Sequence, residues 1–69
     1  MNPNTKVNRI SNVLLYLDNH KYEIVEELFE KASAGYKEEW YNRDPARFWF
    51  HLDLGNQARV VEMAEEYYA

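Results

Sequence analysis

A run of three consecutive aromatic residues in a short, sharply bounded helical segment is the feature that most constrains the fold of this chain. The run consists of Phe48, Trp49 and Phe50. Asp44 can cap a helix that starts at Pro45, and Gly55 suits the position that follows a helix end. At about 100° per residue the rings spread over roughly 200°, whereas a surface helix buries a stripe little wider than about 100°. The segment 44–54 is therefore either the central buried helix, or it presents aromatic surface to another molecule.

The segment before Asp18 has the apolar spacing of an amphipathic helix. One face carries apolar residues at intervals of three and four: Val7, Ile10, Val13, Leu14 and Leu17. The opposite face carries Lys6, Arg9, Asn12 and Tyr16. The helix can be capped by Thr5, or by Asn2 with Pro3 at its first position. Asp18 and Asn19 predict a stop and a restart, with Asn19 as the cap of the next helix.

A second helix is expected over about residues 20–34. Its inner face would be built from Ile24 or Val25, then Leu28, Phe29 and Ala32. Gly35 predicts a break or bend, because glycine is unfavourable in a helix interior by about 1 kcal/mol relative to alanine. The helix is expected to resume over 36–42.

The C-terminal segment predicts a last helix over about 57–67, capped by Asn56. Its inner face would consist of Val60, Val61, Ala64 and one of Tyr67 and Tyr68. No stretch has the alternating pattern of a strand, and the connections are short. The sequence therefore predicts an all-α fold, a compact bundle of about four short helices that forms a single domain over 1–69. In the aromatic helix we expect Phe48 and Leu52 to be buried, and Trp49 or Trp40 to be partly exposed.

The residue inventory argues against an enzyme. The chain has 69 residues and no cysteine, which excludes disulfides, thiolate zinc sites, iron–sulfur clusters and a cysteine nucleophile. Its two serines, Ser11 and Ser33, lie in helical segments without a nucleophile elbow. Its two glycines, Gly35 and Gly55, cannot form a phosphate-binding loop. We expect no catalytic residues and no cofactor.

Metal binding is not expected either. His51 and Asp53 are two residues apart, so they point about 200° apart on a helix and cannot share an ion. Carboxylate pairs at helical spacing exist, for example Glu23 with Glu27, but the Glu-x-x-His pattern of di-iron bundles is absent. Such glutamates are typical of solvated helix exteriors.

The charge distribution restricts the partners. The net charge is −4, made of +2 over residues 1–21 and −6 over 22–69. The acidic larger part would repel a nucleic-acid backbone, so no direct binding to DNA or RNA is expected. No apolar run approaches the roughly 18–20 residues of a membrane span, and no secretion signal opens the chain. We expect a cytoplasmic protein without a membrane partner.

Aromatic and arginine side chains are crowded around the Asp44 start signal, and both kinds are enriched at the energetic centres of protein interfaces. The predicted partner-binding surface consists of Trp40, Tyr41, Arg43, Arg47, Trp49, Phe50 and His51. The alternative is that a small core without disulfides uses these large side chains to fill itself. The two interpretations are about equally supported by the sequence.

A ridge of glutamates on the second helix suggests another kind of surface. The ridge consists of Glu23, Glu26, Glu27 and Glu30. It could imitate nucleic-acid phosphates and occupy a basic groove of another protein. The simpler interpretation is a solvated helix face that confers solubility.

These patterns favour a small acidic helical regulator or inhibitor that docks on a larger protein and blocks or alters it. A short, acidic, cysteine-free domain also resembles many phage-encoded inhibitors of host machinery, which would place it in the host cytoplasm. One alternative is a homodimeric assembly component whose self-interface is the aromatic helix 44–54. Another is an inhibitor that mimics nucleic acid with the acidic ridge.

Overall fold

The computed structural model describes the backbone of residues 5–68 and the side chains of residues 10–68. The described chain contains helices only: α1 Thr5–Asn19, α2 Lys21–Leu28, α3 Ala34–Tyr41, α4 Pro45–His51 and α5 Leu54–Tyr67. The predicted all-α class is confirmed, with five helices in the described residues rather than about four. The expected caps Thr5, Asn2 and Pro3, and the inner-face position Val7, lie outside the described side chains.

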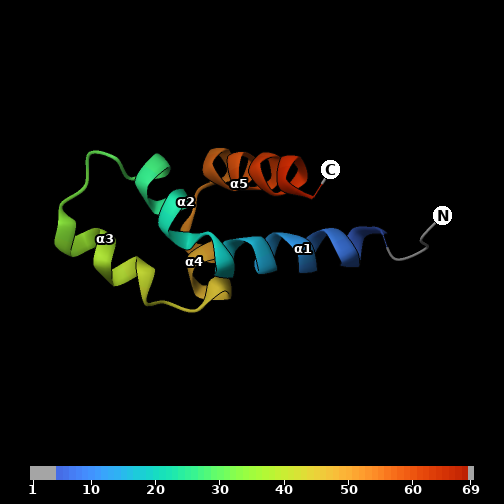
Figure 1. The fold of residues 1–69 in the computed structure, drawn as a ribbon, viewed down its shortest axis with the longest axis horizontal. Helices are drawn as coiled ribbons and strands as arrows, with labels where there is room; N and C mark the ends of the chain where they lie inside the picture. The colour runs from blue at the N-terminus through green and yellow to red at the C-terminus, as the bar shows by residue number, and fades with distance from the viewer. Residues whose placement is uncertain (1–4, 69) are drawn as a thin grey trace.

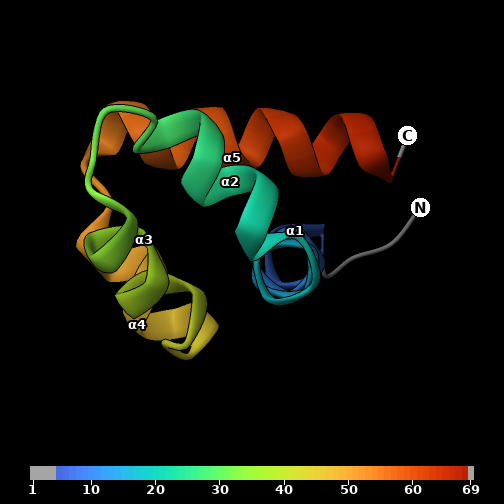
Figure 2. The ribbon, with the colours of Figure 1, turned by 60° about the vertical axis from the view of Figure 1, so that its left-hand side comes forward.

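The helices form an elongated body of 44 × 20 × 19 Å. α1 contacts α2, α4 and α5, and α3 packs on α2 at the end of the molecule opposite the two termini (Figure 1). In Figure 2 α1 is seen nearly end-on while α5 lies across the view, so these two helices cross at a wide angle. The N-terminal half of α1 extends beyond α4, which lies beside its other end (Figure 1).

One apolar core joins four of the five helices. Its members are Val13, Tyr16 and Leu17 of α1, Ile24 and Val25 of α2, Phe48 and Leu52 at α4, and Val60 and Ala64 of α5. α3 contributes no buried residue and adds only the half-buried Trp40 and Tyr41 at the core's edge. Burying each large aliphatic or aromatic side chain stabilises the fold by about 1.5–3 kcal/mol, so this cluster holds α1, α2, α4 and α5 together.

The start of α4 agrees with its sequence signals, and its end does not. The Asp44 carboxylate accepts a hydrogen bond from the Arg47 N–H at 2.9 Å, and Pro45 occupies the first turn. The helix ends at His51 rather than near Gly55, because Asp53 begins the next helix by accepting a hydrogen bond from the Asn56 N–H at 2.8 Å. Asp53, not Asn56, is thus the cap of α5. The predicted burial of Phe48 and Leu52 is confirmed.

The connection between α2 and α3 differs from the prediction of a helix over 20–34. α2 ends at Leu28, and Phe29 follows with φ −119° and ψ 36°, outside helical geometry. Ser33 then caps α3 by accepting a hydrogen bond from the Tyr36 N–H at 3.2 Å. The break therefore precedes Gly35, which lies inside α3. Likewise Asn19 ends α1, and the residue that precedes α2 is His20, whose side chain caps nothing.

Two predicted face assignments in α1 are wrong. Tyr16 was expected on the outer face but is only 7 % exposed. It is covered because α5 crosses α1 there and brings the Tyr67 and Tyr68 rings to 5.5 and 6.4 Å from the Tyr16 ring. Ile10 was expected on the inner face but remains 57 % exposed.

Phe48 and Phe50 provide a matched pair for testing the core. Phe48→Ala should cost about 3–5 kcal/mol of unfolding free energy because the ring is fully buried. Phe50→Ala should stay within about 0.5 kcal/mol because its ring faces solvent. Urea unfolding followed by circular dichroism measures both, and similar losses in the two variants would contradict this core.

Gly35 tests the position of the break. A Cβ added there meets no atom within 4 Å, and the residue has no positive φ. Gly35→Ala should therefore raise the unfolding free energy by about 0.5–1 kcal/mol, through a better helix propensity in α3. Thermal unfolding measures the change. A loss of stability would instead indicate the bend at Gly35 that the sequence suggested.

Candidate functional site

The three aromatic rings of α4 have three different environments. Phe48 is fully buried, Trp49 is half-buried against the edge of the core, and Phe50 is 80 % exposed. A seven-residue helix that sends Phe48 into the core must turn a residue two positions later by about 200°, toward the opposite side. Phe50 is therefore held in solvent by the same geometry that buries Phe48.

Phe50 lies at the edge of an apolar groove between α1 and α4. The groove has a volume of about 240 Å³ and is lined by Ile10, Val13, Leu14, Ala46, Trp49 and Phe50. The Trp49 indole N–H is the only polar group among these side chains, so a molecule that fills the groove would meet largely apolar surface. We refer to this feature as the α1–α4 groove.

The lengths of the two helices explain why the groove is open. At 1.5 Å per residue, α4 is about 10 Å long and α1 about 22 Å. Val13 and Leu17 are buried in the part of the molecule where α4 and α5 pack on α1, whereas Ile10, about one turn closer to the N-terminus, is 57 % exposed. Exposed apolar side chains from the two helices thus border one groove.

Three other predicted surface residues form a separate cluster between α3 and α4. The rings of Trp40 and His51 stack at 4.0 Å, and the Arg43 guanidinium carbon lies 5.5 Å from the centre of the Trp40 ring. Tyr36 adds a hydrogen bond of 3.0 Å between its hydroxyl and His51 Nε2. These contacts fasten α3 to α4, so Trp40, Arg43 and His51 are largely engaged within the chain.

Tyr41 does not belong to either group, because it faces α2. Its ring stacks on Tyr22 at 5.2 Å, and its hydroxyl donates a hydrogen bond to the Glu26 carboxylate, which also pairs with Lys37 at 3.2 Å. The hydrogen bond to Glu26 raises the pKa of Tyr41 to about 12, and the same bond is the main reason that the pKa of Glu26 is lowered.

Of the predicted partner-binding residues, the structure therefore brings Trp49 and Phe50 together at the groove, with Arg47 exposed on the same helix.

Three of the four glutamates of the acidic ridge contact side chains of the same chain. Glu27 pairs with Arg59, whose hydrogen bonds lower the carboxylate pKa, and Arg59 also reaches Glu62 at 3.1 Å. Glu23 lies 2.7 Å from His20, and Glu26 is held as described above. Glu30 is exposed and makes no ion pair with any residue that the structure describes. A partner that bound the ridge would therefore have to compete with internal contacts at three of its four glutamates.

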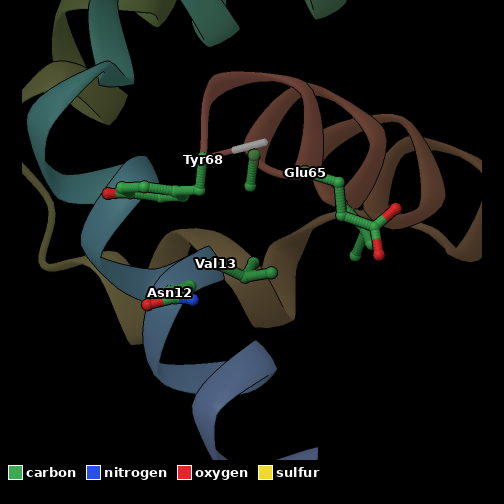
Figure 3. Close-up of a pocket in the computed structure, with 6 residues that line it drawn as sticks. Asn12, Val13, Glu65 and Tyr68 are labelled. Carbon is green, nitrogen blue, oxygen red and sulfur yellow. The ribbon is translucent and has the colours of Figure 1, made fainter. Parts of the chain in front are cut away.

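A second hollow, of about 190 Å³, lies between α1 and α5. Asn12 and Val13 from α1 and Glu65 and Tyr68 from α5 lie on its sides (Figure 3). It has a more polar lining than the α1–α4 groove.

Among the described side chains, no three His, Asp or Glu residues gather as potential ligands of one metal ion. None of the helices in residues 5–68 has the length and apolar character of a membrane span.

Sequence reasoning missed the contribution of α1 to the groove. Ile10 and Leu14 were assigned to the core, yet Ile10 is mostly exposed and Leu14 only half-buried beside Trp49. The sequence carried no clear signal of this, because it predicted an aromatic helix over 44–54, whereas α4 ends at His51 and leaves part of the apolar face of α1 uncovered. Comparison of the chain with protein-family models, curated proteins and solved structures gives no match.

The Tyr41–Glu26 hydrogen bond predicts a pH effect. An ordinary tyrosine loses its proton near pH 10, whereas Tyr41 keeps it to about pH 12 in the folded protein. Between these values the folded state binds more protons than the unfolded state, so this contribution to stability is present below pH 10 and is lost as the pH rises.

Ultraviolet titration of tyrosinate, with Tyr41→Phe used to assign the Tyr41 step, measures this value. Glu26→Gln should bring the Tyr41 pKa back toward 10 by removing the carboxylate that accepts the bond. An unchanged late step in Glu26→Gln would contradict the contact.

Proposed function

We propose that this chain is a protein-binding regulator or inhibitor that docks on a larger protein through the α1–α4 groove. The observation that carries the proposal is the exposure of Phe50 and Ile10, 80 % and 57 %, at one largely apolar groove. Water contact with such side chains is unfavourable, and covering them by a partner would be driven by the hydrophobic effect.

The dimensions of the groove favour a protein over a small molecule. Its volume of about 240 Å³ is below the roughly 300–1,000 Å³ of small-molecule pockets. A protruding side chain of a partner would fill it, and Trp49 and Phe50 are residue types suited to act as anchors around that side chain. When this chain docks through the groove, it covers or alters part of the partner's surface. This effect on the partner is the basis for a regulatory or inhibitory role.

The two other functional hypotheses have less support. Self-association through helix 44–54 uses the same exposed Phe50, and it differs from our proposal only in what covers the groove. Nucleic-acid mimicry requires free carboxylates, whereas Glu23, Glu26 and Glu27 are bound by side chains of this chain. No observation favours the mimic, and we do not propose it.

Phe50→Asp tests the proposed docking surface. It should reduce binding of a captured partner by about 30-fold, the equivalent of about 2 kcal/mol for an interface anchor, while leaving thermal stability nearly unchanged. The measurement is affinity capture from host lysate with mass-spectrometric identification, followed by a titration of the identified partner.

Leu54→Asp is the matched control. Leu54 is 83 % exposed and does not line the groove, so the variant makes the same kind of change elsewhere and should bind as the wild type does. Equal binding by the two variants, or equal loss in both, would contradict docking at the groove.

A further inference from the structure

The charges beside the α1–α4 groove differ in sign from the charge of the molecule. The net charge is −4, yet no acidic residue lines the groove, and the charged residue next to its α4 side is Arg47. The carboxylate of Asp44, at the start of α4, is occupied as the helix cap.

Arg47 is exposed and makes no ion pair with any described residue. The other arginines with described side chains are engaged, Arg43 with Glu39 at 4.0 Å and Arg59 with Glu27 and Glu62, and Lys37 pairs with Glu26. Lys31 is also unpaired, but it does not line the groove. Arg47 is also three residues before Phe50 on the same helix, a spacing that makes two residues surface neighbours. A free guanidinium therefore lies beside the most exposed ring of the groove.

We propose that the α1–α4 groove binds an amphipathic helix of a partner protein, with an apolar anchor in the groove and a carboxylate within one turn of the anchor. This inference rests on the proposed function and names the class of its partner. A groove between two helices accepts a helix that presents apolar residues at i, i+3 or i+4, and i+7. The partner carboxylate faces Arg47 and supplies a charge that this chain does not.

A second copy of the chain fits the groove less well. A two-fold interface centred on the groove would place the Arg47 side chains of both copies around the same apolar patch, with no carboxylate in its lining. Like charges in such positions oppose association. An anionic lipid surface would satisfy Arg47, but it has no protruding side chain to fill a concave cavity of about 240 Å³.

A display library of amphipathic helical peptides, variable at the apolar face and at its flanks, provides the probe. Selection on the wild-type chain should enrich peptides with one apolar face and Asp or Glu within a turn of the central anchor. Replacing these acidic residues by Lys in an enriched peptide should weaken binding at least about threefold, and added salt should reduce that difference. Enriched peptides without acidic flanks would overturn the inference.

Arg47→Glu and Lys31→Glu are a matched pair of charge reversals. Lys31 is exposed, lies outside the groove and makes no ion pair with a described residue. Selection on Arg47→Glu should shift the enriched flanks from acidic to basic residues, whereas selection on Lys31→Glu should leave them acidic. An identical preference in both variants would overturn the role of Arg47.

Further outcomes separate this inference from the proposed function. If no peptide is enriched but Phe50→Asp still loses the captured partner, the inference fails and the proposed function stands. If the enriched peptides bind Phe50→Asp as well as the wild type, the groove is not their site, and the inference fails.

If the chain binds phosphatidylserine vesicles and Phe50→Asp loses this binding, the groove binds a membrane surface and not a partner helix. If sedimentation equilibrium shows a concentration-dependent dimer that the same variant loses, the groove binds a second copy of the chain and not a partner helix. Either result would overturn the inference.

Discussion

Burial of the Phe48 ring is the interaction on which the arrangement of the other helices depends. The ring is fully buried in a core shared by α1, α2 and α5, and the rings of Phe29 and Trp40 lie 6.0 and 5.8 Å from it. Because α4 has only seven residues, this one side chain sets the rotation of the helix about its axis. Phe50 is then exposed by helix geometry, and the groove beside α1 results from satisfying the core.

Polar contacts attach the part of the chain that the core does not hold. α3 has no buried residue, and it is joined to α2 by hydrogen bonds from Tyr41 and Lys37 to Glu26. The Lys21 ammonium also donates to the main-chain carbonyl of Arg43, which links the start of α2 to the loop before α4. Three of the glutamates that looked like a free acidic surface therefore act within the chain, and the apolar groove is one surface that internal contacts leave open.

Local sequence signals predicted those features that depend on a few neighbouring residues. Asp44 and Pro45 identified the start of α4, since a cap involves only the first turn. Helix ends were harder to predict: Gly35 and Gly55 suggested stops, but Ser33 and Asp53 cap helices that include both glycines. In both places a polar side chain that accepts a hydrogen bond from the first turn begins the helix, and the glycine lies within it.

The sequence by itself determined the helical class and the crowding of aromatic and arginine residues near Asp44, because helix periodicity is a local property. Only the tertiary structure decided which of those residues share a surface. It brought Trp40, Arg43 and His51 together between α3 and α4, turned Tyr41 toward α2, and left Trp49 and Phe50 beside Ile10. Periodicity assigns a side chain to a face of its helix, but the length and crossing angle of neighbouring helices decide whether that face is covered.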